Sequence, residues 1–250
     1  MLHVKNLTLK IPSKTLVEDV SFKVQPGQTT CLVGASGSGK SLVAKAIMGL
    51  LPEGIKQTAG EIYFNDKDCS TLSPEERRRL RGKSMAMIFQ EPMSALNPVL
   101  TIGYQIEEVF QAHTNLSRAR RLQAIESLLN KVGIMSARQK SYADELSGGQ
   151  RQRVVIAMAV ALSPQLLLAD EPTTALDVTV QAQILRLLTD IQKDAGMGML
   201  FITHDFGIVS MLANDIVVMQ QGRIVEQGAA EKILSAPEHP YTQELMALAT

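Results

Sequence analysis

The sequence contains no tryptophan, and aromatic residues make up only 4% of its 250 residues. Proteins that hold single-stranded nucleic acid stack its bases on aromatic side chains, and this chain has little material for such stacking. Basic and acidic residues balance at 25 each, with an isoelectric point near 6.9, so no excess of positive charge favours a phosphate backbone. We therefore expect no nucleic-acid partner.

Cysteine and long apolar runs are also scarce. Cys31 and Cys69 are the only cysteines and lack the CxxC spacing, which makes a disulfide framework or a cysteine metal site unexpected and fits a reducing compartment. The longest apolar run, 154–162, is far shorter than the roughly 20 residues of a membrane-spanning helix. The first residues do not resemble a signal peptide. We expect a soluble chain that reaches a membrane only through a partner.

Short β-rich runs alternate with helical patterns, which predicts an α/β fold around a mostly parallel sheet. A further pair of runs around Gln220–Gly222 has the pattern of a β-hairpin. The expected buried strands lie in 29–33, 84–90, 164–172 and 198–205, and the last two runs end in charged or polar residues.

Helical periodicity dominates the middle of the chain, after a loop that contains two prolines. We interpret about 91–163 as a helical subdomain inserted into a single domain that covers 1–250. The core and a β-region then comprise 1–90 and 164–230, and 231–250 forms a C-terminal helical tail broken at prolines.

The stretch "GASGSGKS", Gly34–Ser41, fits the P-loop pattern G-x-x-x-x-G-K-[ST] between an expected strand and an expected helix. Its glycines let backbone N–H groups turn towards phosphates, and the helix N-terminus adds positive potential. Lys40 is expected to reach the β- and γ-phosphates of ATP, and the Ser41 hydroxyl to bind Mg²⁺. The predicted phosphate-binding residues are Gly34, Ala35, Ser36, Gly37, Ser38, Gly39, Lys40, Ser41 and Leu42.

Polar residues end three of the expected strands. In "LLLADEP", Asp170 is placed to hold Mg²⁺ and Glu171 to polarise the attacking water or accept its proton. Gln90 and His204 end two other strands, so they are expected near the Mg²⁺ shell, the water or the γ-phosphate. We predict catalytic roles for Lys40, Gln90, Glu171 and His204, and Mg²⁺ contacts from Ser41, Gln90 and Asp170.

A second anion-binding pattern lies in "DELSGGQRQR". Ser147 can cap the following helix, and Gly148 and Gly149 allow backbone amides to approach an anion. This stretch lies in the expected helical subdomain, which places it out of reach of the chain's own P-loop. Two copies arranged head to tail would let it close over the nucleotide of the other copy.

The set and order of these motifs resemble an ABC transporter ATPase subunit, from end to end of the chain. The resemblance implies a P-loop NTPase (RecA-like) core, an N-terminal antiparallel β-region and an inserted helical subdomain. It implies that Gln90 couples nucleotide to the membrane subunits, that Glu171 is the catalytic carboxylate and that His204 is the switch histidine. Ser147, Gly148, Gly149 and Gln150 would act on the partner's ATP, with Asp177 at the dimer interface.

The same resemblance implies the partners. They are two integral-membrane permease subunits, a second ABC ATPase of a different sequence and, indirectly, an extracytoplasmic solute-binding protein. The chain would lie on the cytoplasmic face of the inner membrane as a peripheral subunit. Met93, Leu96, Pro98, Val99 and Leu100 would offer an apolar surface to the permeases, with an internal packing loop as the alternative.

Finer features indicate the cargo. The segments "QEPMSALNPVLTIGYQI", "EPTTALDVTVQAQIL" and "PEHPYTQELMALA" resemble the ATPases of the peptide, opine and nickel importer group. The short length, the absence of C-terminal cysteines and "GLLPEGIKQTAGEI" are more similar to the D-type ATPase of nickel or metal-chelate importers. Nickel or a metal chelate is our first expectation, a di- or oligopeptide the alternative.

The residue that contacts the adenine base is the next question. The family usually stacks adenine on an N-terminal aromatic residue, yet 1–21 contain none, so Leu9 or Ile11 is expected to pack on the base.

A non-transport ABC ATPase acting on nucleic acid or ribosomes is a remote alternative, because such proteins carry long insertions or a second P-loop, which this chain lacks. A small-molecule kinase would leave "LSGGQ" and His204 without a role.

Overall fold

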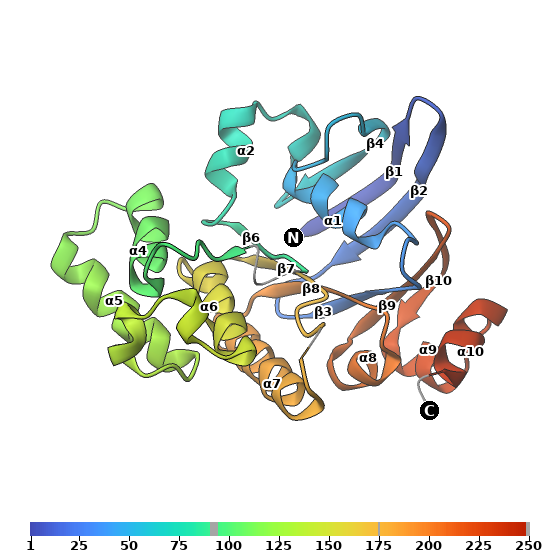
Figure 1. Cartoon of the computed structure of the whole chain (residues 1–250). Helices are drawn as coiled ribbons and strands as arrows, with labels where there is room; N and C mark the ends of the chain where they lie inside the picture. Colours follow the sequence, from blue (N-terminus) through green and yellow to red (C-terminus); the bar gives the residue numbers. More distant parts are fainter. Residues whose placement is uncertain (91–94, 175, 249–250) are drawn as a thin grey trace. The chain divides into compact units, whose positions relative to one another are not determined.

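The computed structural model describes residues 1–90, 95–174 and 176–248 (Figure 1). The chain divides into two compact units. Unit 1 comprises 1–78 with 196–250, and unit 2 comprises 79–195. The ends of two expected segments, 91–94 of the helical subdomain and 249–250 of the tail, lie outside the described residues, as does Met93 of the expected docking surface.

An antiparallel sheet with the order β2-β1-β4-β5 belongs to unit 1. Apolar residues alternate along β1, so that Leu2, Val4, Leu7 and Leu9 are buried, as expected for a strand with one covered face. The bounds of its strands are β1 (Leu2–Ile11), β2 (Lys14–Val24), β4 (Lys56–Phe64) and β5 (Lys67–Asp68).

A second group of strands in unit 1 has the order β10-β9-β3-β8. Its bounds are β3 (Thr29–Val33), β8 (Gly198–Thr203), β9 (Asp215–Gln220) and β10 (Arg223–Ala229). Strand β3 pairs in parallel with β8 and with β9, and every residue of β3 and β8 is buried. Continuous burial explains the unbroken apolar runs that predicted these strands. Strands β9 and β10 form the predicted hairpin, which turns at Gln221 and Gly222 with positive φ.

Helices follow several of these strands. Helix α1 ends where Gly49 adopts a left-handed conformation (φ 63°), the usual way in which glycine stops a helix. The predicted C-terminal tail region contains two short helices, and Pro240 begins the second of them. The bounds are α1 (Lys40–Met48), η1 (Cys69–Thr71), α2 (Pro74–Leu80), α8 (Phe206–Leu212), α9 (Ala230–Ser235) and α10 (Pro240–Ala247).

Unit 2 contains two buried parallel strands and the helices of the middle of the chain (Figure 1). The first part of the expected helical subdomain forms two separate helices, α4 and α5. Ser117 caps the second of them by accepting a hydrogen bond from the N–H of Arg120 (3.5 Å). The bounds are β6 (Met85–Ile88), β7 (Leu166–Asp170), α4 (Ile102–His113), α5 (Arg118–Lys131), η2 (Ser136–Lys140), η3 (Ala143–Glu145), α6 (Gly148–Val160) and α7 (Val178–Ala195).

The described helices include none with the length and apolar character needed to cross a lipid bilayer. Helices α4, α5 and α6 instead bury their apolar side chains within unit 2. Ile102, Ile106, Ile125, Leu129 and Ile156 have no exposed surface.

An ion pair joins helices α4 and α5. The Nε atom of Arg121 lies 2.9 Å from Oε1 of Glu107, and the two side chains are only 18% and 12% exposed. The guanidinium also donates to the carbonyl oxygen of Leu116 (2.7 Å). A carboxylate this far from water needs its partner, because an unpaired charge is costly to bury.

We expect Arg121→Ala to lower the free energy of unfolding by about 2 kcal/mol or more, because it leaves the Glu107 charge unpaired. Urea unfolding followed by circular dichroism measures this change. Arg78→Ala is the matched control, since it removes an exposed ion pair with Glu75 and should leave the free energy of unfolding nearly unchanged. Equal effects of the two substitutions would contradict the structural role of the Arg121–Glu107 pair.

Candidate functional site

The loop from Gly34 to Gly39 connects β3 to α1 in unit 1. A side chain at Gly34 would overlap the backbone carbonyl of Met219 in β9, so only glycine fits there. Gly39 precedes α1 with φ 103°, a conformation that other residues rarely adopt. The glycines therefore allow a tight turn against β9 that brings the chain directly into a helix.

Lys40, the first residue of α1, is 4% exposed and folds back over this loop. Its Nζ atom donates to the carbonyl oxygens of Gly34 (2.7 Å) and Ala35 (3.0 Å) and lies 3.5 Å from Oγ of Ser38. These contacts hold the ammonium group beside the N-terminal end of the helix. Backbone N–H groups and a cation at one helix N-terminus suit a chain of phosphates.

His204 follows β8 directly, at the strand end that corresponds to the end of β3. Val33 pairs with Thr203 in the parallel register, so Gly34 and His204 are the next residues of two neighbouring strands. His204 is exposed, while Asp205 caps α8 by accepting hydrogen bonds from the N–H groups of Gly207 (2.7 Å) and Ile208 (3.4 Å). The structure thus brings the P-loop and the predicted switch histidine to one edge within unit 1.

Gln90 and Glu171 meet in unit 2 for a similar reason. Ile88 of β6 pairs with Ala169 of β7, and Gln90 and Glu171 each lie two residues further along. Nε2 of Gln90 donates to Oε2 of Glu171 (3.2 Å), which also accepts a hydrogen bond from the hydroxyl of Thr174 (2.9 Å). Thr174 was not among the predicted site residues, although its spacing of three residues from Glu171 was visible in the sequence.

Glu171 also has an unusual backbone. Its φ is +46°, which is uncommon for a residue with a side chain and is a form of strain that gathers at functional sites. The neighbouring Asp170, at the end of β7, is 2% exposed. The side chain of Glu171 is therefore fixed by a special backbone conformation and by two hydrogen bonds, beside a buried carboxylate suited to a hard cation such as Mg²⁺.

Ser147 begins α6 with a capping box. Its hydroxyl accepts a hydrogen bond from the N–H of Gln150 (3.3 Å), and the side chain of Gln150 accepts one from the N–H of Ser147 (3.0 Å). Ser147 and Gly148 are exposed. The first turn of this helix therefore reaches the surface of unit 2, and Ser147 caps the helix as predicted.

Gly149 lies against the start of α7. A Cβ atom at this position would be 2.6 Å from Cγ1 of Val180, whereas one at Gly148 would be 3.8 Å from Leu176. Asp177 caps α7 by accepting a hydrogen bond from the N–H of Val180 (2.9 Å). Packing of α6 on α7 therefore brings the second anion-binding pattern and Asp177 together in unit 2.

Two residues that were expected to offer an accessible surface, Leu9 and Leu96, are buried. Leu9 has no exposed surface within β1, so it cannot pack on a base, and Ile11 is the half-buried residue of the two. Leu96 is 3% exposed and belongs to the core of unit 2, whereas Val99 is 74% exposed. The N–H of Ala35 donates to the hydroxyl of Tyr241 (2.9 Å). Burial depends on strand pairing and helix packing, which the local pattern did not reveal.

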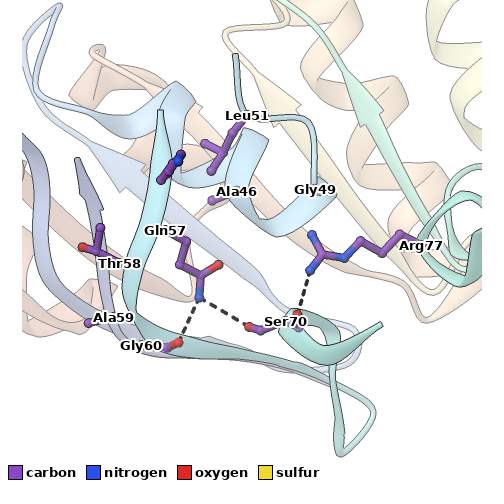
Figure 2. A pocket seen from close by; sticks show the side chains of 10 residues that line it. Ala46, Gly49, Leu51, Gln57, Thr58, Ala59, Gly60, Ser70 and Arg77 are labelled. Carbon is purple, nitrogen blue, oxygen red and sulfur yellow. Dashed lines mark hydrogen bonds between the residues drawn. The ribbon is translucent and has the colours of Figure 1, made fainter. Parts of the chain in front are cut away.

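A cavity of about 580 Å³ lies at the other end of α1 (Figure 2). Its polar groups bind one another: Arg77 donates to the carbonyl oxygen of Ser70 (2.9 Å), and Gln57 donates to that of Gly60 (2.9 Å). A helix C-terminus carries partial negative charge, which disfavours phosphate. This cavity is therefore distinct from the P-loop and does not serve as its phosphate pocket.

A P-loop, a strand that ends in Asp-Glu and a capped Ser-Gly-Gly helix start define the class of an ATP-binding cassette. Comparison with known sequences agrees: the model of the family described as ABC transporter matches residues 17–174. The chain belongs to this family and is an ATPase of it.

Curated relatives are similar over most of this chain. A putative peptide import ATP-binding protein of Brucella ovis is 50% identical over 238 residues, 92% of this chain and 70% of the relative. The dipeptide transport ATP-binding protein DppD of Escherichia coli is 47% identical, over 92% of this chain and 71% of the relative. The peptidoglycan transport ATP-binding protein YejF of Agrobacterium fabrum is 49% identical, and the chain spans only 46% of its length.

Solved structures share the fold. The dimeric cassette MJ0796, in a post-hydrolysis state bound to ADP and phosphate, has a TM-score of 0.81 and 27% identity over 92% of this chain and 99% of that one. CbiO1 of Clostridium perfringens, part of an ABC transporter complex, has a TM-score of 0.82 and 26% identity over 94% and 90%. The predicted fold class is confirmed: an α/β cassette with parallel strands and an antiparallel N-terminal sheet. ATP with Mg²⁺ is the ligand of this family.

We expect Gly149→Ala to lower the free energy of unfolding by about 1 to 3 kcal/mol, because its methyl group would overlap Val180. Gly148→Ala is the matched control one residue earlier, where only an ordinary contact is expected. Combining Gly149→Ala with Val180→Ala should recover most of the loss. Thermal and urea unfolding of the four chains measure these changes, and a loss that Val180→Ala fails to relieve would contradict the packing explanation.

Proposed function

We propose that this chain hydrolyses ATP to power a membrane importer of di- or oligopeptides. The observation that carries the cargo class is the identity of about 50% to a relative named for peptide import, along 92% of this chain. The dipeptide transport relative supports the same class. The relatives described above include none named for nickel, so the peptide alternative replaces our first expectation of nickel or a metal chelate.

The P-loop residues Gly34 to Leu42 supply the phosphate grip in this proposal. The Lys40 ammonium group is already held by backbone carbonyls, so little of its freedom remains to be lost when phosphates bind. Ser41, Gln90 and Asp170 would hold Mg²⁺, which supplies positive charge to the phosphate oxygens when bound. The buried carboxylate of Asp170 and the hydroxyl of Ser41 are oxygen donors of the kind that Mg²⁺ prefers.

Glu171 is the proposed base. Its Oε2 accepts hydrogen bonds from Gln90 and Thr174, which orient the carboxylate that would act on a water molecule. The carboxylate would position this water and take its proton as the oxygen attacks phosphorus. His204, exposed at the end of β8, is proposed to contact the γ-phosphate and to respond to its loss.

Assembly as a head-to-tail dimer is the second part of the proposal. Ser147, Gly148, Gly149 and Gln150 lie at an exposed helix start and would bind the ATP held by a partner cassette, with Asp177 nearby at the interface. The dimeric structures of MJ0796, which share the fold of this chain, support such an assembly. The partner would be a second ATPase of different sequence.

The remaining partners follow from the importer class. We propose two integral-membrane permease subunits, fed by an extracytoplasmic solute-binding protein, with this chain bound peripherally at the cytoplasmic face of the inner membrane. Pro98, Val99 and Leu100 would contribute apolar contacts to the permeases, Val99 being the most exposed large apolar residue of the three.

We expect Glu171→Gln to bind ATP normally and to hydrolyse it at least about 100-fold more slowly, because the amide cannot accept the proton. An ATP-bound dimer should then accumulate in size-exclusion chromatography. Glu53→Gln, a neutralised exposed carboxylate, is the control and should behave as the unmodified chain. Normal turnover in Glu171→Gln would remove Glu171 from the catalytic role.

Uptake of radiolabelled dipeptide and of radiolabelled nickel, in cells with and without this chain, distinguishes the cargo classes. We expect dipeptide uptake to fall to background without the chain and to return with it, but not with the Glu171→Gln variant. Nickel uptake should not change. A selective loss of nickel uptake would instead support the metal importer.

A further inference from the structure

The C-terminal helix α10 contacts the P-loop through one hydroxyl group. The phenol oxygen of Tyr241 accepts a hydrogen bond from the backbone N–H of Ala35 (2.9 Å), a residue 206 positions earlier in the chain. Both residues belong to unit 1. None of the roles assigned above uses Tyr241, and its contact lies directly on the loop that binds phosphate.

The geometry connects Tyr241 to Lys40 through a single peptide group. The N–H of Ala35 and the carbonyl of Gly34 belong to the same planar unit. Tyr241 binds the N–H side of this unit, and Nζ of Lys40 donates to the carbonyl side (2.7 Å). Rotation of the peptide would therefore break both contacts at once.

Glycine makes this restraint necessary. Gly34 has no Cβ atom, so the peptide that follows it rotates more freely than one after any other residue. The close approach of Met219 excludes a side chain that could limit this rotation. A hydrogen bond from outside the loop is the remaining way to fix the orientation of the carbonyl that holds Lys40.

Hydrogen bonds at the start of α10 fix the position of Tyr241. His239 caps α10 by accepting the N–H of Tyr241 at Nδ1 (3.2 Å), and Pro240 begins the helix. Glu226 of β10 accepts hydrogen bonds from the N–H groups of Glu238 (2.9 Å) and His239 (3.1 Å). Burial opposes the charge of Glu226, but contacts with the Thr242 hydroxyl and these two amides outweigh it and lower the pKa of the carboxyl. The Glu226 carboxylate, which holds the start of α10, is thus charged at neutral pH.

We propose that Tyr241 is a positioning residue for ATP binding: its hydroxyl fixes the Gly34–Ala35 peptide, and thereby the Lys40 ammonium group that receives the phosphates. Holding the loop in place before ATP arrives lowers the entropy lost on binding. The C-terminal tail then contributes to nucleotide affinity without touching the nucleotide.

Tyr241→Phe removes the hydroxyl and keeps the ring, so it tests this role in the full chain. We expect the Kd for a fluorescent ATP analogue to rise about three- to tenfold, the worth of one hydrogen bond. Without nucleotide the Tm should equal that of the control Tyr63→Phe, which removes a hydroxyl bound to Glu61 in the same unit. The control should leave the Kd unchanged.

A double-mutant cycle separates positioning from a general structural effect. In a Lys40→Ala background, Tyr241→Phe should no longer change the Kd, because the residue acts through Lys40. An unchanged Kd in Tyr241→Phe alone would overturn the proposal. So would an equal loss of affinity in the Lys40→Ala background, or a fall in Tm beyond that of Tyr63→Phe.

Discussion

The nucleotide-binding half of this molecule depends on where one buried charge is held. The ammonium group of Lys40 is 4% exposed and lies against backbone carbonyls of its own loop. A cation shielded from water needs oxygen partners, and the loop provides them only because it turns sharply at Gly34 against Met219 of β9. The pairing of β3 with β9 therefore bears directly on the position of the Lys40 ammonium group.

Strand register also positions the other predicted site residues, Gln90, Glu171 and His204. Parallel strands end at a common edge, so residues that follow register partners become neighbours. The Ile88–Ala169 pair places Gln90 beside Glu171, and the Val33–Thr203 pair places His204 on the strand next to the P-loop. Backbone pairing within each unit thus brings these residues together, and hydrogen bonds from Gln90 and Thr174 orient the Glu171 carboxylate in unit 2.

Much of the fold could be predicted because its signals are local. The buried strands appear as unbroken apolar runs, the P-loop as a fixed spacing of glycines before Lys40, and the start of α6 as Ser147 with Gln150 three residues later. Predictions that required knowledge of burial were less successful. Leu9 and Leu96 look available in the sequence, yet pairing of β1 and packing within unit 2 cover them. The proposed cargo class rests on the relatives, because the motifs identified in this sequence do not indicate which cargo is recognised.

The sequence was enough to predict the class of chemistry: a phosphate-binding loop, adjacent carboxylates for a metal ion and a water, and a second anion-binding helix start. Each of these motifs consists of residues close together in the chain, so the spacing of those residues is sufficient to identify the motif. Only the three-dimensional structure shows which groups from distant parts of the chain orient the residues of these motifs. Gln90 and Glu171 are 81 residues apart and Ala35 and Tyr241 are 206 apart. Such hydrogen bonds exist only where folding has already brought the backbones together, and no local pattern specifies their partners.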